Sequence, residues 1–528
     1  MTINCIFTFA SAQRIDFEII IPIALTSVLG PAMTSLKPRE PYSPAELQAL
    51  YPSSLELRQV QVLLRHGERT PITSRFENTG LPAFWPYCRD VTTLRTALLN
   101  SRTDGFTGFE WKRHLETFAS DEDDSPKLVW GPHGNVDSIC DNGTLTDQGR
   151  RTTYALGTRL RSLYVDKLGF LPKTITSTDW MYLRATPIPR ARESLQQAFL
   201  GLYPEEDRAP NLPAPAIISR NPAQETLYPN DLHCRRLAHL AREFSIRTAQ
   251  RWNNSPELQY VNNKIGKWMP PHSPRVAIDS KPSLVGVLDT INATLAHGPA
   301  TRLPAEFYDP KLLEIGEKLA IEEWFSGYAE SNEYRKLGVG SLLGDIVQRM
   351  VVSCAQLPGV PPPELNARGD TQRPVKFAMS GCHDTTLAAA LTSLGDRSAL
   401  RKWPFFTSHI AFELFSRKEK ALHADQAVND ELTKKPMGRI SSLDKERWGD
   451  EEERALDGWF VRVRYNDEPI ILPGCRKPGN HLDGDVSFCT LSAFKSIVDK
   501  FTPTNWRREC RANIDAPVFP EKPEPAGY

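Results

Sequence analysis

Apolar and polar residues follow two different periods along the chain, and segments with each period alternate. Residues 55–64 (LELRQVQVLL) first alternate and then become continuously apolar, as a buried parallel strand does. From residue 145 the leucines recur three and four positions apart, the spacing of a helix that packs on a sheet, and Thr146 is a candidate N-cap. The pattern predicts a strand, a polar loop and then a surface helix.

The same order recurs twice. Residues 177–185 are predicted as a strand, and the helix that follows two prolines stops at Tyr203. Residues 375–379 are predicted as another strand, followed by a turn and by a helix over 386–394 that ends at Gly395. Further strands are expected at residues 410–415 and 459–465. Repeated strand-then-helix order predicts a doubly wound α/β core flanked by helices, with ligands bound where strands end and helices begin.

The predicted core is interrupted by a long segment without strand-like runs. Residues 205–345 carry helical patterns broken by Pro and Asn, which is typical of an inserted, mostly α-helical cap domain. We therefore expect residues 55–204 and 346–515 to form the α/β core. An N-terminal extension at 1–54 and a loose tail at 516–528 complete the expected organisation.

The N-terminal extension contains an apolar run, residues 19–29, of signal-peptide length. Asp16 and Glu18 stand just before it, where a signal would carry Lys or Arg, and the run is too short to span a bilayer as a helix. Met33 then opens a polar, Pro-rich stretch, so we expect the preceding residues to be disordered or to come from an over-extended gene model. Secretion is not supported; an intracellular protein, cytoplasmic or mitochondrial and without stable membrane insertion, is expected.

Charge and cysteine content exclude several classes of partner and cofactor. Lys plus Arg (64) balances Asp plus Glu (64), so no net field would draw the chain to nucleic acid. The 9 cysteines are scattered without a CxxC pair or metal-ligand spacing, which argues against a structural zinc and favours free thiols. Cys475 and Cys489 bracket a loop that a disulfide would close in an oxidising compartment.

The first candidate for chemistry is RHGERTP, which follows the first predicted strand and brings Arg65, His66 and Arg69 close together in the sequence. A phosphate monoester is an anion, and guanidinium groups offer planar, paired donors to its oxygens. Cations beside an imidazole favour its neutral form, which keeps the lone pair needed to attack phosphorus. An R-H-G triplet standing alone would be surface decoration.

A second motif, SGCHDTT, supplies His383 and Asp384 at the end of another predicted strand, so both motifs are expected at one edge of the sheet. His383 can donate to phosphate oxygens, and a carboxylic acid at Asp384 can protonate the leaving alcohol. The plainer interpretation of Asp384 is a cap for the helix that begins near Thr385, which is compatible with catalysis. Neither step requires a metal or an organic cofactor.

A third motif is RATPIPR, which begins with Arg184 after the strand that ends near residue 183. Together with RHGERTP at 65–71, LTDQG at 145–149 and HDTT at 383–386, it makes the chain resemble the histidine acid phosphatase branch of the phosphoglycerate-mutase-like superfamily. The resemblance implies a large α/β domain with a mostly α-helical cap, in agreement with the segmentation above.

The resemblance also implies roles for individual residues. His66 matches the family's phosphorylated nucleophile, and Asp384 matches its proton donor. The family's phosphate ligands are matched by Arg65, Arg69, Arg184 and His383. The family usually has R-S-T-D where this chain has R-A-T-P, so the acid that would support Arg184 is missing.

Within this branch, ETLYPN (225–230), WFVRVRY (459–465) and the PGC turn (473–475) resemble lysophosphatidic acid phosphatases. The implied partner is a small-molecule phosphate monoester, with a single-chain phospholipid as the specific candidate. A phytase-like or broad-specificity acid phosphatase is the alternative, and a non-catalytic phosphate-binding module a more remote one. A sugar-phosphate mutase of the same superfamily would lack the late His-Asp pair.

Overall fold

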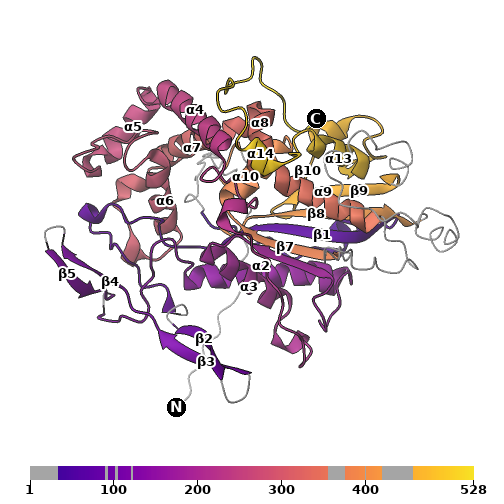
Figure 1. Ribbon diagram of the computed structural model, residues 1–528, viewed down its shortest axis with the longest axis horizontal. Coiled ribbons are helices and arrows are strands. Elements are labelled where there is room, and N and C mark those ends of the chain that lie inside the picture. The colour runs from indigo at the N-terminus through magenta and orange to yellow at the C-terminus, as the bar shows by residue number, and fades with distance from the viewer. Residues whose placement is uncertain are drawn as a thin grey trace, which may run out of the picture.

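The computed structural model describes residues 34–89, 93–100, 105–120, 123–131, 133–354, 375–398, 400–418 and 456–528. In these residues the chain forms a central mixed sheet with helices on both faces, and further helices gather beyond one end of the sheet (Figure 1). The predicted fold class, an α/β core sheet flanked by helices, is confirmed.

The main sheet is 8-stranded, in the order β11-β12-β9-β8-β1-β7-β6, with β10 beside β9. Its strands are β1 (Leu55–Arg65), β6 (Met181–Ala185), β7 (Phe377–Cys382), β8 (His409–Arg417), β9 (Trp459–Tyr465), β10 (Glu468–Ile470), β11 (His481–Leu482) and β12 (Asp485–Thr490). Strands β1, β7 and β6 run parallel, whereas β8, β9 and β12 each run antiparallel to their neighbours. The doubly wound arrangement is therefore confined to one half of the sheet.

Helices cover the two faces of the sheet in separate groups. On one face α2 (Asp147–Arg161) and α3 (Pro189–Leu202) bury their apolar residues against β1, β6 and β7. On the other lie α9 (Ser341–Cys354), α10 (Asp384–Ser393) and α13 (Leu491–Asp499). The predicted N-cap of α2 is present: the Thr146 hydroxyl accepts from the Gly149 N–H at 3.3 Å.

Every named element from residue 205 to residue 354 is a helix. They include α4 (Arg235–Trp252), α5 (Pro256–Ile265), α6 (Leu284–Leu295), α7 (Pro310–Glu330) and α8 (Asn332–Arg335). Most of these helices gather around an apolar cluster of their own, away from the sheet (Figure 1). In the part of the chain that the structure describes, one stretch, Asn332–Cys354, is long and apolar enough to cross a membrane, but 56% of its apolar 18-residue window is buried inside the protein, as in a core helix.

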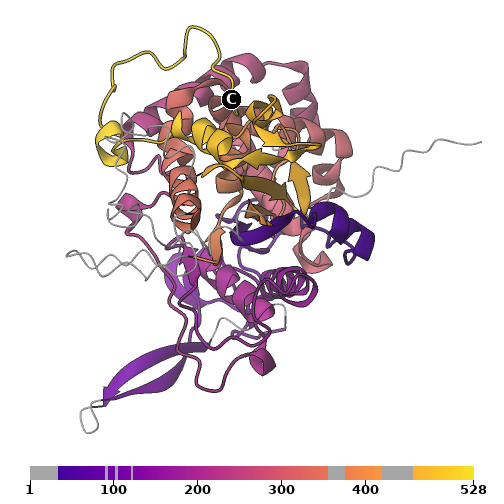
Figure 2. The same ribbon diagram turned by 90° about the vertical axis from the view of Figure 1, so that its right-hand side faces the viewer.

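Two β-ribbons were not predicted. They pair β2 (Thr93–Asn100) with β3 (Gly105–Lys112) and β4 (Glu116–Ser120) with β5 (Asp123–Leu128), and they lie at the periphery of the molecule (Figures 1 and 2). Phe109, Trp111 and Phe118 are exposed on them. Every residue of β5 is exposed, so this strand has no buried face whose apolar residues would mark it in the sequence.

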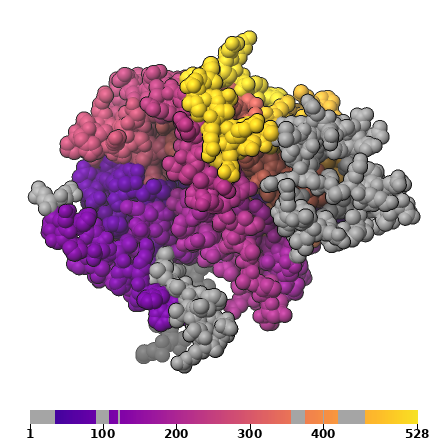
Figure 3. Space-filling view, in the orientation of Figure 1, coloured from indigo at the N-terminus to yellow at the C-terminus, as the bar shows by residue number. Residues whose placement is uncertain are grey.

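Both described ends of the chain are tied to the body. The helix α1 (Pro44–Leu50) is followed by Tyr51, whose hydroxyl donates to buried Glu413 at 2.6 Å. Residues 516–528 were expected to form a loose tail, and this is wrong: Glu524 N–H bonds to the Glu330 carbonyl at 2.8 Å. The tail also buries backbone groups against the core, and Figure 3 shows the C-terminal segment lying on the surface of the molecule. Residues 1–33, including the apolar run and Met33, lie outside the described residues.

The expectation of free thiols is also wrong for most cysteines. Disulfides join Cys88 to Cys140, Cys234 to Cys510 and Cys475 to Cys489. The last is the pair that brackets a loop in the sequence; the other two join segments 52 and 276 residues apart, which sequence spacing alone does not reveal. Cys382 is buried and forms no disulfide.

Candidate active site

Three of the motifs meet at one edge of the sheet because they follow the carboxyl ends of three adjacent parallel strands. In the register of these strands Arg65, the last residue of β1, lies opposite Cys382 at the end of β7, and Ala185 at the end of β6 lies opposite Gly381. Parallel strands end on the same side, so the loops after them share one edge. The prediction that RHGERTP and SGCHDTT lie together is confirmed.

The loop that carries the RHG triplet passes very close to the start of α2. A Cβ atom added to Gly67 would stand 2.3 Å from the backbone oxygen of Gly149, so only glycine fits there. The Gly67 N–H donates to the Ser194 hydroxyl of α3 at 3.1 Å, and Thr146 donates to the Glu68 carbonyl at 3.1 Å. The LTDQG motif thus fixes the loop that holds His66.

The His66 side chain is buried, and one ring nitrogen has a backbone partner. Nδ1 lies 2.9 Å from the Gly67 carbonyl, so it carries the hydrogen and donates, which leaves the lone pair on Nε2. Burial, and then the charges of Arg190 and Arg65, hold the pKa of His66 well below its usual value of 6.5. The ring is therefore neutral and has a nucleophilic nitrogen even in mildly acidic solution.

Guanidinium groups from two segments surround this imidazole. Arg65 and Arg69 come from the RHG loop, and Arg190 comes from the first turn of α3, where burial and the neighbouring Arg69 lower its pKa to about 9. All three have a buried Nε atom with no hydrogen-bond partner. Buried donors are normally satisfied, so three unsatisfied donors around one histidine indicate a site that accepts an anion.

Arg184 lies elsewhere, although the resemblance assigned it to phosphate. It is fully buried on β6, where it forms an ion pair with Glu225, and its other close carboxylate is Asp345 at 3.8 Å. Arg190, six residues later in the same motif, is the one whose charge acts on His66. We therefore correct the assignment: Arg184 binds Glu225, and Arg190 takes its place around His66.

The HDTT motif supplies the other side of the site. The rings of His383 and His66 are 5.4 Å apart, and His383 Nε2 lies 3.1 Å from the Thr186 hydroxyl. Burial and Arg190 lower the pKa of His383 to about 3, so this ring is neutral as well. His383 occupies the N-cap position of α10 and Asp384 is its first residue, where the Asp384 carboxylate accepts from the Thr385 N–H at 2.8 Å.

The Asp384 carboxylate has charged and polar partners on one oxygen. Its Oδ2 accepts from Arg65 at 2.7 Å and from the indole N–H of Trp403 at 3.0 Å. Burial alone would raise its pKa, but the charge of Arg65 and the Trp403 hydrogen bond outweigh burial and lower it to about 2. Asp384 is therefore ionised when no other anion is bound.

The helical region adds one carboxylate that sequence analysis missed. Asp289 of α6 accepts from Arg69 at 2.7 Å through Oδ1, and from the Ile72 N–H at 2.9 Å through Oδ2. It lies more than two hundred residues from the RHG loop in a helix with no recognisable motif. No motif marks Trp403 either. Arg190, in contrast, lies within RATPIPR, a motif that the sequence analysis singled out.

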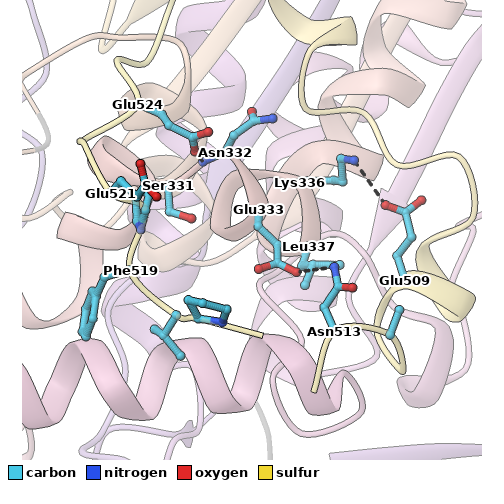
Figure 4. Close-up of a pocket in the computed structure, with 14 residues that line it drawn as sticks. Ser331, Asn332, Glu333, Lys336, Leu337, Glu509, Asn513, Phe519, Glu521 and Glu524 are labelled. Carbon is cyan, nitrogen blue, oxygen red and sulfur yellow. Dashed lines mark hydrogen bonds and ion pairs between the residues drawn. The ribbon is translucent and has the colours of Figure 1, made fainter. Parts of the chain in front are cut away.

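A cavity among the described residues lies apart from this site and shares no lining residue with it. It encloses about 490 Å³ between the C-terminal segment and α8 (Figure 4). Its charged side chains are Glu333, Glu509, Glu521 and Glu524 with one lysine, Lys336. Such a cavity would repel a phosphate, so its size does not make it the active site. No group of three or more His, Cys, Asp or Glu side chains in the described ranges could hold a metal ion.

Comparisons with known proteins agree with this chemistry. Residues 56–429 match the family described as histidine phosphatase superfamily (branch 2). A probable acid phosphatase of Schizosaccharomyces pombe is 34% identical, over 87% of this chain and 95% of its own length. Lysophosphatidic acid phosphatase type 6 of Bos taurus is 25% identical over 85% and 84%. Among solved structures, the Hafnia alvei phytase covers 87% of this chain and 99% of its own, with a TM-score of 0.49 and 15% identity.

Proposed function

The chain belongs to branch 2 of the histidine phosphatase superfamily, and from this membership we propose that His66 and Asp384 carry out its reaction in two steps. The protein is a histidine acid phosphatase, a phosphoric monoester hydrolase. The observation that carries the assignment of residues is the set of unsatisfied guanidinium donors around a neutral, buried histidine.

In the first step Nε2 of His66 attacks phosphorus and forms a P–N bond. The P–O bond to the alcohol breaks, its electron pair passes to the leaving oxygen, and the proton of Asp384 neutralises that oxygen. The Nδ1–H of His66 stays hydrogen-bonded to the Gly67 carbonyl, which stabilises the positive charge on the phosphorylated ring. Without the proton the alcohol would leave as a high-energy alkoxide.

In the second step water attacks the phosphohistidine, and the Asp384 carboxylate accepts a proton from it. The P–N bond breaks with its electrons returning to Nε2, and inorganic phosphate is released. Arg65, Arg69 and Arg190 hold the phosphoryl oxygens through both steps, and His383 donates to them when its proton is on the ring nitrogen that faces the phosphate. These donors are already in place, so little reorganisation is needed during the reaction.

Asp384 must gain a proton before it can donate one, although its pKa is about 2 without substrate. A bound phosphate shares the positive charge of Arg65 that now stabilises the carboxylate. Its own negative charge also disfavours a second anion beside it. Substrate binding is therefore expected to raise the pKa of Asp384 and to load the proton that the first step uses.

The test of this assignment is Asp384→Asn, which removes the acid and leaves the arginines in place. The variant should lose at least about 100-fold in kcat on an alkyl phosphate, because positioned acids contribute that much. It should lose far less on nitrophenyl phosphate, whose leaving group needs little protonation. Steady-state kinetics on both substrates give the ratio, and equal losses would contradict the assignment.

For the natural substrate we propose a phosphomonoester with one acyl chain, a lysophosphatidate. Two observations support it. The Bos taurus relative of that name aligns over most of both chains. Exposed Trp324 also packs edge to face against Trp403, which contacts Asp384, so apolar surface adjoins the side from which the alcohol would leave. The alternative is an inositol phosphate, which would place further negative charge beside Asp289.

Chain length distinguishes these substrates. If the acyl chain is bound, kcat/KM for lysophosphatidates should rise with each added methylene, by up to about 0.8 kcal/mol in transition-state binding. Inositol hexakisphosphate should be much poorer. No rise with chain length, or a preference for the inositol phosphate, would place the enzyme with phytase-like or broad-specificity acid phosphatases and would leave the roles of His66 and Asp384 unchanged.

We also propose a compartment for this protein, because six of its cysteines are paired in disulfides. Three disulfides support maturation in an oxidising compartment, against the intracellular location expected from the N-terminal sequence. Alkylation of the denatured native protein without reductant should label Cys382 but not the six paired cysteines. Labelling of all of them in protein from its natural source would restore the original expectation.

A further inference from the structure

We propose that Trp403 is a positioning residue that directs the proton of Asp384 to one oxygen, Oδ1, and connects the acid to helix α7. The proposal rests on the function of Asp384 proposed above. It starts from a contact that the sequence does not predict: the indole Nε1 of Trp403 lies 3.0 Å from Oδ2 of Asp384. Trp403 stands in the loop between α10 and β8, 19 residues after Asp384.

The two oxygens of Asp384 have different partners. Oδ2 faces Arg65 and Trp403, and both of these groups can only donate. A proton on Oδ2 would have to displace one of these donors. Within the described part of the chain Oδ1 has one partner, the N–H of Thr385 at 2.8 Å, and keeps a second lone pair. The proton that Asp384 transfers is therefore carried by Oδ1, and it passes from there to the leaving oxygen as the P–O bond breaks.

The indole is held from the side of α7. Its ring packs against Phe325 with centroids 4.9 Å apart and against Trp324 at 6.2 Å. The backbone N–H of Trp403 donates to Glu317 at 2.9 Å. All three partners lie on α7, so the orientation of the carboxylic acid on the core depends on a helix outside the sheet. Asp289 makes the corresponding connection from α6 to Arg69.

The charged and titratable groups that act on the Asp384 carboxylate come from every element around it: Arg65 on β1, Arg69 in the loop after it, Arg190 on α3, and Cys382 and His383 beside α10. Arg65 is the strongest of them. Among the described residues the indole N–H of Trp403 is the neutral side-chain donor to this carboxylate, beside the backbone N–H of Thr385. Its removal leaves the charge of the site unchanged, so a phenylalanine at position 403 tests the hydrogen bond by itself.

The test is Trp403→Phe, which keeps an aromatic ring against Phe325 but removes the donor. We expect kcat on an alkyl phosphate to fall about 10-fold, the value of one hydrogen bond to a charged group, with little change on nitrophenyl phosphate. Loss of the donor also raises the pKa of Asp384, so the fall of kcat at high pH should move to higher pH. A purely structural role would lower both substrates equally and leave the pH profile in place.

Two further variants complete the test. Trp506→Phe removes an equivalent indole bond, 2.8 Å to the Leu337 carbonyl, and should leave both substrates unaffected. Glu317→Gln weakens the hold on the Trp403 backbone from a half-buried position and should reproduce a smaller part of the alkyl phosphate loss. If Asp384→Asn separates the two substrates and Trp403→Phe does not, the positioning role is wrong. If Asp384→Asn itself fails to separate them, the proposed function of Asp384 is wrong instead.

Discussion

Two clusters of buried arginines lie at the same sheet. They differ in whether all of their buried guanidinium nitrogens have hydrogen-bond partners. Around His66, Arg65, Arg69 and Arg190 each keep an unpaired buried Nε. On the antiparallel half, Arg462 and Arg464 of β9 have no such atom. Both bind Glu413, which also accepts from two tyrosine hydroxyls, those of Tyr51 and Tyr164.

The charge balance of the two clusters differs in the same way. The Glu413 cluster pairs two guanidinium groups with Glu413 and, through Arg464, with Asp467 at 3.9 Å. It is complete without a ligand. In the His66 cluster Asp384 binds Arg65, and Asp289 is shared between Arg69 and Arg75, which lies outside the cluster. Arg190 has no carboxylate partner of its own among the ion pairs of the described residues. A buried cation cluster that lacks counter-charge is a binding site, and one that is balanced is part of the core.

The largest expected effect is at the nucleophile. His66→Ala should reduce kcat on nitrophenyl phosphate by at least about 10⁴-fold, since no other side chain can accept the phosphoryl group. Exposed His272 provides the control, and His272→Ala should be indistinguishable from the parent. Substantial turnover by His66→Ala would mean that water attacks phosphorus directly in this enzyme.

A change in the balanced cluster should act on stability and not on catalysis. Glu413→Gln leaves Arg462 and Arg464 buried without their carboxylate, so the free energy of unfolding should fall by about 3–5 kcal/mol. Below the melting temperature kcat should stay close to that of the parent. Chemical denaturation measures the loss, and Glu468→Gln on the exposed strand β10 is the control, with a change within about 0.5 kcal/mol. A large drop in kcat with unchanged stability would show that the two clusters are coupled.

The two arginines of the RATPIPR motif should behave oppositely. Arg190→Ala should weaken transition-state binding by about 2–4 kcal/mol, measured as a fall in kcat/KM. It should not lower Tm, because Arg190 lies among other cations that repel it. Arg184→Ala leaves Glu225 buried and unpaired and should lower Tm. Kinetics and thermal melts of both variants check this, and a catalytic loss with unchanged Tm in Arg184→Ala would return that residue to the phosphate site.

The smallest expected effects come from a change of pH. A rise in pH should lower the activity of the His66 cluster, whereas a fall in pH should lower the stability that the Glu413 cluster contributes. The proposed mechanism needs Asp384 protonated and His66 neutral. Since the pKa of His66 is well below 6.5, activity should peak on the acidic side of neutrality and decline as pH rises. Burial would raise the pKa of Glu413, but Arg462 and Arg464 lower it. A carboxylate with a lowered folded pKa stabilises the fold above its unfolded pKa and loses that contribution as pH falls.

Stability should therefore decline only in more acidic solution than the optimum of activity. A pH-rate profile and denaturation at several pH values separate the two. An activity optimum above about pH 8, where a carboxyl group of reference pKa near 3.9 holds almost no protons, would contradict the role of Asp384 as the acid.

The sequence alone determined the parallel half of the sheet and the residues of its edge. Continuously apolar segments predicted the strands β1 and β7, because burial on two faces requires apolar residues at successive positions. Apolar residues three and four positions apart predicted the helices α2 and α3, because each buries one face. The motifs after those strands predicted that His66, Arg65, Arg69, His383 and Asp384 lie close together, and they do. Local sequence was enough because parallel strands bring their own following loops to a common edge.

Only the tertiary structure decided which other groups face His66. The sequence offered Arg184 and Arg190 in one motif, but the strand places the first against Glu225, and the first turn of α3 places the second at the site. Asp289 and Trp403 reach it from segments that no motif marks. The cysteine pairs were decided in the same way. Contacts between distant segments depend on how helices pack against the sheet, and a local pattern of apolar and polar residues does not encode that distance.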